Sequence, residues 1–246
     1  MTVVAGLWTE VEVRPDHDLL CLRGGLSLAT VPRARRVLAK LLHDRGAVIV
    51  DLADAELAWG PAAEIFPSTL ASAGGWPTTR LVLTGADGRF ATQLRALRIH
   101  RSVPLVDDPG DAPAHLYRRP ERVTRHRDLP VDIVAPAMAR ALVREACADW
   151  SATAAEDAAA LVASELVSNA VQHAGGTCRV SVAVDGTRLR VAVRDYAPGH
   201  GPRPRPVDIN RPTGRGLHLV ALLSSAWGVH QHPDGKTAWA VIPLPV

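Results

Sequence analysis

The stretch from residue 165 to residue 173 constrains this chain more than any other. Glu165, Asn169 and His173 are four residues apart, so on a helix they form one polar stripe beside apolar neighbours. A buried carboxylate and a buried amide are costly unless something pairs with them. A hydrated divalent metal carrying a phosphate chain would pair with both, through the amide oxygen as a hard ligand and the carboxylate as ligand or proton acceptor. Taken alone, the segment also fits an ordinary amphipathic helix with a polar edge.

Composition places the chain among ordinary globular proteins. Its 246 residues are 47% hydrophobic and 22% charged, and the net charge of +3 is weak for a dedicated nucleic-acid binder. Nearly all the positive charge is arginine, since Lys40 and Lys236 are the only lysines. Cys21, Cys147 and Cys178 are scattered and lack metal-ligand spacing, which predicts free thiols in a reducing compartment. With no membrane-spanning run and no leader-like N-terminus, we expect a soluble cytoplasmic protein.

A break in the hydrophobic pattern predicts a domain boundary near residue 120. Residues 107–110 read Asp-Asp-Pro-Gly, which is a turn cluster, and residues 118–127 are basic, contain proline and show no period. We therefore expect a first domain over residues 1–116, a linker over 117–127 and a second domain over 128–246.

The first domain alternates strands and helices, which predicts a sheet covered by helices. Thr30 is expected to be the N-cap of its first helix, with Pro32 in the first turn. The expected strands are 19–22, 48–52, 80–84 and 103–106, and the expected helices are 31–42, 61–73 and 89–97.

The second domain is ordered differently, with two helices before its strands. We expect helices packed on one face of a mixed sheet, with a hairpin turning at Asp185 and Gly186 and a second turn at residues 234–235. The expected helices are 136–150, 156–173 and 215–224, and the expected strands are 179–184, 189–195, 228–230 and 237–242.

A second motif lies where the strand ending at Asp195 meets a glycine-containing loop. An aspartate is unexpected in a strand that enters the core. Its carboxylate would accept the exocyclic amino proton of adenine and favour adenine over guanine, and Gly199 and Gly201 would let backbone approach the purine. The alternative is that Asp195 only opens a turn, which is common before Pro-Gly.

A third motif, Thr213-Gly214-Arg215-Gly216-Leu217, opens a helix. The two glycines let the backbone come close to a ligand, and the free N–H groups of a helix start bind phosphate oxygens. Thr213 also fits a plain N-cap. A single Gly-x-Gly is weak on its own.

Together, the three motifs resemble in their chain order the nucleotide site of the GHKL ATPase superfamily. A helix carries Glu and Asn at i and i+4, a strand ends in Asp before glycines, and a loop leads to Gly-x-Gly at a helix start. The short version here, with its closing Trp-Gly and Gly-Lys-Thr-Ala-Trp strands, is similar to bacterial anti-sigma-factor serine kinases. The resemblance covers residues 128–246 and implies a Bergerat-type α/β sandwich that binds ATP and Mg²⁺.

The resemblance also implies a role for each motif residue. Asn169 would coordinate Mg²⁺, Glu165 would be the catalytic carboxylate that draws the proton from an attacking serine hydroxyl, and Asp195 would read adenine. His173, one turn further along, is expected to be structural. The expected nucleotide-binding residues are Asn169, Asp195, Gly199, Gly201, Thr213, Gly214, Arg215, Gly216 and Leu217.

Two departures from the family pattern bear on catalysis. Ala197 stands where a glycine is usual two residues after the adenine-binding aspartate. Pro212 stands where an arginine often precedes the Ser/Thr-Gly of the phosphate loop, although Arg211 and Arg215 flank it. Either arginine would supply the charge on the γ-phosphate, but its displaced position makes catalysis a weaker expectation than nucleotide binding.

The first domain resembles the STAS fold of anti-sigma-factor antagonists over residues 10–116, through its Asp51-Leu52 strand and the helices around it. STAS antagonists present a phosphorylatable serine where the next helix starts. Here residues 58–62 read Ala-Trp-Gly-Pro-Ala and contain no hydroxyl, and Ser27 replaces a usual aspartate. We expect the phosphoacceptor function to be lost, with Ser68, Thr69 and Ser72 as ordinary helix residues.

Two functional hypotheses follow. The first is an ATP-binding switch protein that controls a sigma factor or a STAS-domain antagonist through protein binding and serine phosphorylation. The second is a catalytically inactive module that holds ATP and acts only by protein–protein contact. The sequence leaves open whether the chain is an enzyme, in which case it would be an ATP-dependent serine/threonine kinase. It also leaves open whether the chain forms a homodimer.

Three other roles are not expected. A sensor histidine kinase needs a helix pair with a phosphoacceptor histidine, and the preceding His115 and His126 lie in the irregular segment. The basic stretches 118–127 and 203–211 are broken by proline and lack interleaved aromatics, so no nucleic-acid partner is expected. No membrane partner is expected either.

Overall fold

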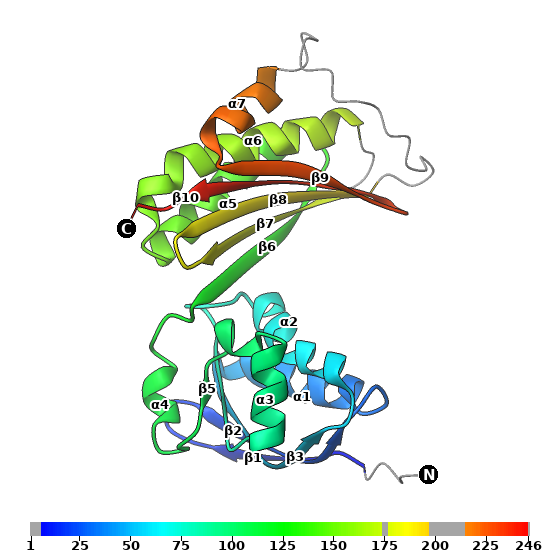
Figure 1. The fold of residues 1–246 in the computed structure, drawn as a ribbon, viewed down its shortest axis with the longest axis vertical. Helices are drawn as coiled ribbons and strands as arrows, with labels where there is room; N and C mark the ends of the chain where they lie inside the picture. Colours follow the sequence, from blue (N-terminus) through cyan, green and yellow to red (C-terminus); the bar gives the residue numbers. More distant parts are fainter. Residues whose placement is uncertain (1–5, 174–176, 197–214, 246) are drawn as a thin grey trace. The chain divides into compact units, whose positions relative to one another are not determined.

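The computed structural model describes residues 6–173, 177–196 and 215–245, and the side chains of His173 and Arg215 lie outside this description. The chain divides into two compact units, Met1–Val123 and Thr124–Val246, each with its own sheet (Figure 1). This confirms the expected fold class of two mixed α/β domains.

The N-terminal unit contains a five-stranded sheet in the order β1-β2-β3-β4-β5. Strands β2 to β5 run parallel, and β1 pairs antiparallel with β2 at the edge. The strands are β1 (Trp8–Val13), β2 (Asp18–Leu26), β3 (Ala47–Leu57), β4 (Arg80–Thr84) and β5 (Leu105–Val106), and the helices are α1 (Val31–Arg45), α2 (Ile65–Ser72), α3 (Gly88–Ala96) and α4 (Ala112–His115), with 3₁₀ turns at Gly60–Glu64 and Ile99–Arg101.

Strand β3 shows why helices cover both faces of this sheet. Val48 and Val50 point to one face and join the larger core with residues of α1, α2 and α3, while Ile49 points to the other and joins a smaller core with Ala112 of α4. A run of buried apolar residues without alternation is typical of such a two-sided strand.

Thr30 occupies the N-cap position of α1, as expected, but its side chain does not cap the helix. The helix begins after Thr30, and Pro32 lies in its first turn as expected, but the Thr30 side chain makes no capping hydrogen bond. Instead, Thr30 Oγ1 donates to the Gly25 carbonyl oxygen at 2.8 Å and accepts from the Ser27 N–H at 2.8 Å. Because Thr30 itself has helical dihedral angles, its hydroxyl faces back toward β2 and ties the helix start to that strand.

The C-terminal unit contains a five-stranded sheet in the order β6-β7-β8-β10-β9, with α5, α6 and α7 on one face (Figure 1). Strands β7 and β8 form a hairpin that turns after Asp185, as expected. The strands are β6 (Arg122–Pro130), β7 (Thr177–Asp185), β8 (Arg188–Tyr196), β9 (Ala226–His232) and β10 (Gly235–Pro243), and the helices are α5 (Ala135–Asp149), α6 (Glu156–His173) and α7 (Arg215–Leu223), with a 3₁₀ turn at Thr153–Ala155.

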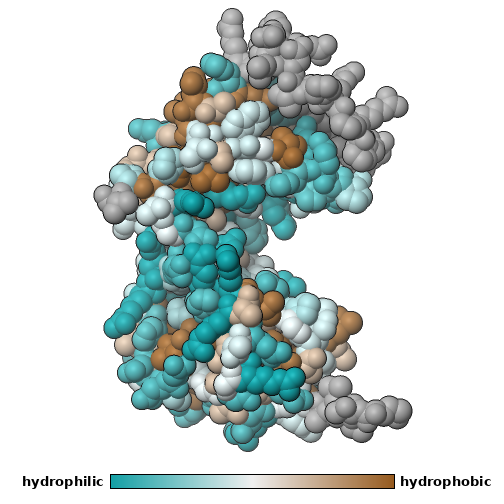
Figure 2. All heavy atoms as spheres, in the orientation of Figure 1, coloured by the Kyte–Doolittle hydropathy of each residue, from teal (hydrophilic) through white to brown (hydrophobic). Residues whose placement is uncertain are grey.

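Alternation along the strands builds this second core. Val180 and Val182 of β7 and Val191 and Val193 of β8 are buried beneath the helices. Helix α7 packs through the buried Val220 and leaves Leu222 69% exposed, and Figure 2 shows hydrophobic atoms at the surface over this helix.

The expected linker over residues 117–127 is only partly a linker. From Arg122 onward the chain is strand β6, which extends to Pro130 and joins the C-terminal sheet. Only Val123 and Leu129 of this strand are buried, so its sequence has no apolar run that would predict a strand. Among the described helices, none is both long enough and apolar enough to span a membrane.

Candidate functional site

Helix α6 presents the predicted polar stripe. It spans Glu156–His173 as expected, and its acidic first turn complements the positive end of the helix dipole. Glu165 and Asn169 are half-buried, one turn apart, between the buried Leu166 and Ala170. Glu165 and Asn169 of the stripe therefore lie at the margin of the core, while the His173 side chain lies outside the described residues.

The start of α7 lies against this stripe. A Cβ atom built on Gly216 would be 2.3 Å from Oε2 of Glu165, so no other residue type fits there without moving the carboxylate. Arg215 and Gly216 are the first two residues of α7, and Leu217 after them is half-buried. Two predicted motifs, far apart along the chain, thus meet at one point.

The contact between Glu165 and Gly216 is also an electrostatic one. The free N–H groups and the dipole of a helix start favour negative charge. The Glu165 carboxylate lies at this helix start, which places a negative group where the sequence predicts phosphate binding. Thr213 and Gly214 of the same motif lie outside the described residues, as do Gly199 and Gly201 of the second motif.

Asp195, near the end of β8, is buried, with only 4% of its surface exposed. Its Oδ1 accepts a hydrogen bond of 3.0 Å from the backbone N–H of Lys236, and its Oδ2 lies 3.7 Å from Nζ of the same lysine. The described partners of the carboxylate are therefore on β10, the strand next to β8.

Sequence reasoning missed Lys236 as a site residue. Only the strand register places Lys236 at the site, because it pairs Lys236 of β10 with Asp195 of β8. On the other side of β8, the buried Cys178 of β7 pairs with the same aspartate. Burial, with the nearby Asp195 charge as a second cause, raises the pKa of the Cys178 thiol, so this thiol stays protonated at neutral pH.

The turn after β3 in the N-terminal unit has no hydroxyl group. Strand β3 ends at Leu57, and residues 58–62 lead into the 3₁₀ turn Gly60–Glu64. Downstream, Ser68 Oγ donates to the Glu64 carbonyl oxygen at 2.5 Å and Ser72 Oγ to the Ser68 carbonyl oxygen at 2.9 Å, while Thr69 is buried. Ser68 and Ser72 are thus ordinary helix residues, as the sequence predicts, whereas Oγ1 of Thr69 is buried without a hydrogen-bond partner among the described residues.

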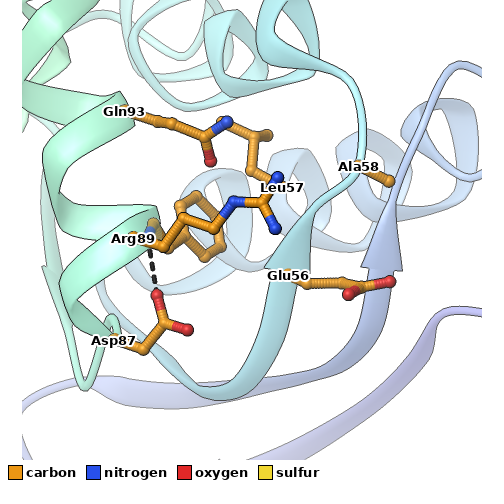
Figure 3. A pocket seen from close by; sticks show the side chains of 7 residues that line it. Glu56, Leu57, Ala58, Asp87, Arg89 and Gln93 are labelled. Atoms are coloured by element: carbon orange, nitrogen blue, oxygen red, sulfur yellow. Dashed lines mark hydrogen bonds between the residues drawn. The ribbon is translucent and has the colours of Figure 1, made fainter.

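A small depression of about 170 Å³ lies beside this turn. Figure 3 shows Arg89 of α3 between the carboxylates of Asp87 and Glu56, with Asp87 Oδ1 accepting the Phe90 N–H at 2.6 Å. Asp87 is thereby the N-cap of α3. The remaining lining residues are Leu57, Ala58 and Gln93.

Comparison with known families decides the nature of the C-terminal unit. Residues 130–242 match the family described as the histidine kinase-like ATPase domain. The C-terminal unit is a histidine kinase-like ATPase domain. Membership of this family implies ATP as the ligand of the domain.

The other comparisons concern solved structures and curated proteins. An anti-sigma factor antagonist from Mycobacterium paratuberculosis shares 16% identity, covers 46% of this chain and 96% of its own, and gives a TM-score of 0.42. The anti-sigma factor antagonist SpoIIAA in its unphosphorylated form shares 10% identity, covers 44% of this chain and 94% of its own, and gives a TM-score of 0.36. No curated protein sequence matches the chain significantly.

The described residues of the ATPase domain fit a nucleotide with its metal ion. Gly216 in the first turn of α7 lies at the Glu165 carboxylate, Asn169 offers an amide oxygen one turn away, and Asp195 keeps a buried carboxylate. Oxygen donors of this kind suit Mg²⁺. Within the described part of the chain, no cluster of three or more His, Cys, Asp or Glu side chains forms a metal site of its own.

Proposed function

We propose that the ATPase domain binds Mg-ATP and that the chain is a regulatory protein of the anti-sigma switch type. The observation that carries this proposal is the approach of the Glu165 carboxylate to Gly216 at the start of α7. It joins the acidic helix to the phosphate-binding motif within a domain of known family.

Each motif would bind a different part of Mg-ATP. Asn169 would hold Mg²⁺, the backbone from Gly214 to Leu217 would hold the phosphates, and Asp195 would hold the base. When bound, Mg-ATP supplies the transferable phosphoryl group and the cation that offsets its charge. That cation is needed here, because phosphates at the start of α7 would otherwise face the negative Glu165 directly.

Glu165 would then act on the nucleophile. Its Oε2 would accept the proton from an attacking serine hydroxyl of a partner protein, which makes the oxygen a better nucleophile. The half-buried position of Glu165 keeps the carboxylate close to the helix start while leaving it within reach of a docked partner.

The N-terminal unit would act as an antagonist mimic that a kinase binds without modifying. The support is the hydroxyl-free turn at residues 58–62, with the downstream Ser68 and Ser72 bonded to helix carbonyls and Thr69 buried. The partner would be a sigma factor or a STAS-domain antagonist that has a phosphorylatable serine. The docking site for the N-terminal unit would be this chain's own ATPase domain or a sister kinase.

A second candidate is an ATP-holding module that acts by contact alone. It is favoured by Pro212 and Ala197, which replace an arginine and a glycine of the related kinases. Under this candidate nucleotide is a structural ligand, and partner binding continues when Glu165 is neutralised.

Calorimetry tests the nucleotide site directly. Mg-ATP is titrated into the full chain, into Asn169→Ala and into the control Ser168→Ala, which alters the neighbouring half-buried residue of α6. We expect magnesium-dependent binding that Asn169→Ala abolishes and Ser168→Ala keeps. A correctly folded wild type that takes up no Mg-ATP would refute the proposal and leave a protein-interaction scaffold.

A further inference from the structure

The carboxylate proposed to read the base already has a cation beside it. Lys236 Nζ lies 3.7 Å from Asp195 Oδ2, and the side chains of the lysine and the aspartate are 33% and 5% exposed. Lys236 is one of only two lysines in the chain, the other being the exposed Lys40 of α1. Although most of the positive charge of the chain is arginine, the cation at this carboxylate is a lysine ammonium group, which is a compact hydrogen-bond donor.

The turn between β9 and β10 fixes Lys236 in this position. A Cβ on Gly235 would lie 2.2 Å from the Asp195 carbonyl oxygen, so the turn backbone packs directly on β8. Asp234 forms an ion pair with Arg194, the neighbour of Asp195. Together with the backbone hydrogen bond from Lys236 to Asp195 Oδ1, these contacts hold the lysine in register with the aspartate.

An acceptor and a donor side by side change which base fits. Adenine carries an amino donor at C6, and guanine carries a carbonyl acceptor at the same place. A carboxylate alone binds the amino group and repels the carbonyl oxygen. An ammonium group at the carboxylate competes with the adenine amino group for Oδ2 and donates to a guanine O6, so it acts against adenine selectivity in two ways.

We infer that Lys236 is a specificity-determining residue of the nucleotide site, and that it widens base choice from 6-aminopurines to 6-oxopurines. The inference rests on the proposed nucleotide site, since it concerns the base that this site selects. It modifies the simple expectation that Asp195 favours adenine.

The test compares the affinities for Mg-ATP and Mg-GTP by calorimetry in the full chain and in Lys236→Met. The wild type is expected to bind both nucleotides with dissociation constants within about tenfold of each other. Lys236→Met removes the charge and keeps the length, and the ratio of ATP to GTP affinity should rise by about tenfold or more, the usual size of discrimination from one base-edge contact. Lys236→Thr should shift the ratio in the same direction.

The matched control is Lys40→Met, which removes the same charge from α1 in the other unit and should leave the ratio unchanged. An unchanged ratio in both Lys236 variants overturns the inference while the nucleotide site stands. Equal weakening of both nucleotides also overturns it, since Lys236 would then only hold the strand pair together. A folded wild type that binds neither nucleotide refutes the proposed function, and the inference with it.

Discussion

Two contacts between distant parts of the chain bring the residues of the candidate site together. Glu165 touches the helix start at Gly216, and Asp195 is bonded by Lys236 from the neighbouring strand. The helical period predicted that Glu165 and Asn169 share a face, because it depends only on local geometry. Neither the Gly216 contact nor the Lys236 ion pair follows from a local pattern, since both arise when distant elements pack.

The Gly216 contact predicts the effect of a single methyl group. In Gly216→Ala the new Cβ must displace Glu165 Oε2, the far end of a flexible, half-buried side chain, so the free energy of unfolding in urea should change by about 1 kcal/mol at most. The displaced carboxylate would still disturb the proposed site, and we expect at least about tenfold weaker Mg-ATP binding.

Gly88→Ala is the control, because Gly88 also lies in the first turn of a helix, but a methyl group added there would have no atom within 4 Å. This change should leave stability within about 1 kcal/mol of wild type. Equal effects of the two substitutions on Mg-ATP binding would mean that the Glu165 contact does not decide the outcome.

Glu165→Gln separates binding from catalysis. The amide keeps the size of the side chain but accepts no proton, so Mg-ATP affinity should change little while phosphoryl transfer to a partner serine falls by about 10²–10⁴-fold. Single-turnover transfer from labelled ATP measures the second quantity. Transfer at the wild-type rate would exclude Glu165 as the base, and absence of transfer in the wild type would favour the non-catalytic module.

Strand β6 is the element that sequence patterns describe least well. Several of its residues are basic, so the segment resembles a linker, yet it binds the C-terminal unit through several charged groups. Arg125 contacts Asp149 at 2.6 Å and lies over the Trp150 ring, and Arg179 of β7 makes two hydrogen bonds to Asp128. By contrast, strand β4 and helix α6 match their predicted bounds, because runs of apolar residues mark them clearly.

Truncation tests the role of β6. A fragment of residues 122–246 should fold, whereas a fragment of residues 131–246 loses the buried Leu129 and leaves the edge of β7 unpaired. Burial of one such side chain contributes about 1.5–3 kcal/mol. Circular dichroism and urea unfolding compare the two fragments. Equal stability would show that β6 is dispensable to its sheet.

Strand β6 also predicts a pH dependence. Burial, and then the positive Arg179, lower the pKa of His126 below its ordinary value of 6.5. As the pH falls through 6.5 the unfolded chain takes up this proton first, so stability is complete above that pH and declines below it until the folded state also protonates.

His126→Gln should flatten this decline in the free energy of unfolding between about pH 7 and 5. His17, whose pKa is also lowered chiefly by burial, contributes a parallel loss that the variant leaves in place. An unaltered slope would mean that His126 is equally easy to protonate in the folded and unfolded states.

The molecule as a whole is built from two units with separate cores. The N-terminal core gathers around β3 and the C-terminal core around β7 and β8, and only the second contains the ATPase family match. The two-domain organisation was predictable because the order of strands and helices changes along the sequence. The position of the domain boundary was harder to predict, because β6 starts inside the basic stretch.

Calorimetric unfolding of the full chain tests this organisation. We expect two transitions, and Mg-ATP at about 100 times its dissociation constant should stabilise only one of them, by about 2.7 kcal/mol. The isolated fragment of residues 122–246 identifies which transition belongs to the ATPase domain. A single transition that shifts as one would show that the two units unfold together.

Under the proposed function, the turn at residues 58–62 has a consequence for signalling by the N-terminal unit. A chain without a hydroxyl there forms no phosphoester, so the turn keeps no covalent record of an encounter with a kinase. The effect of a kinase that binds at this turn therefore ends when the kinase dissociates. Its duration is then set by a dissociation rate and its strength by the number of molecules present, and no phosphatase is required to erase it.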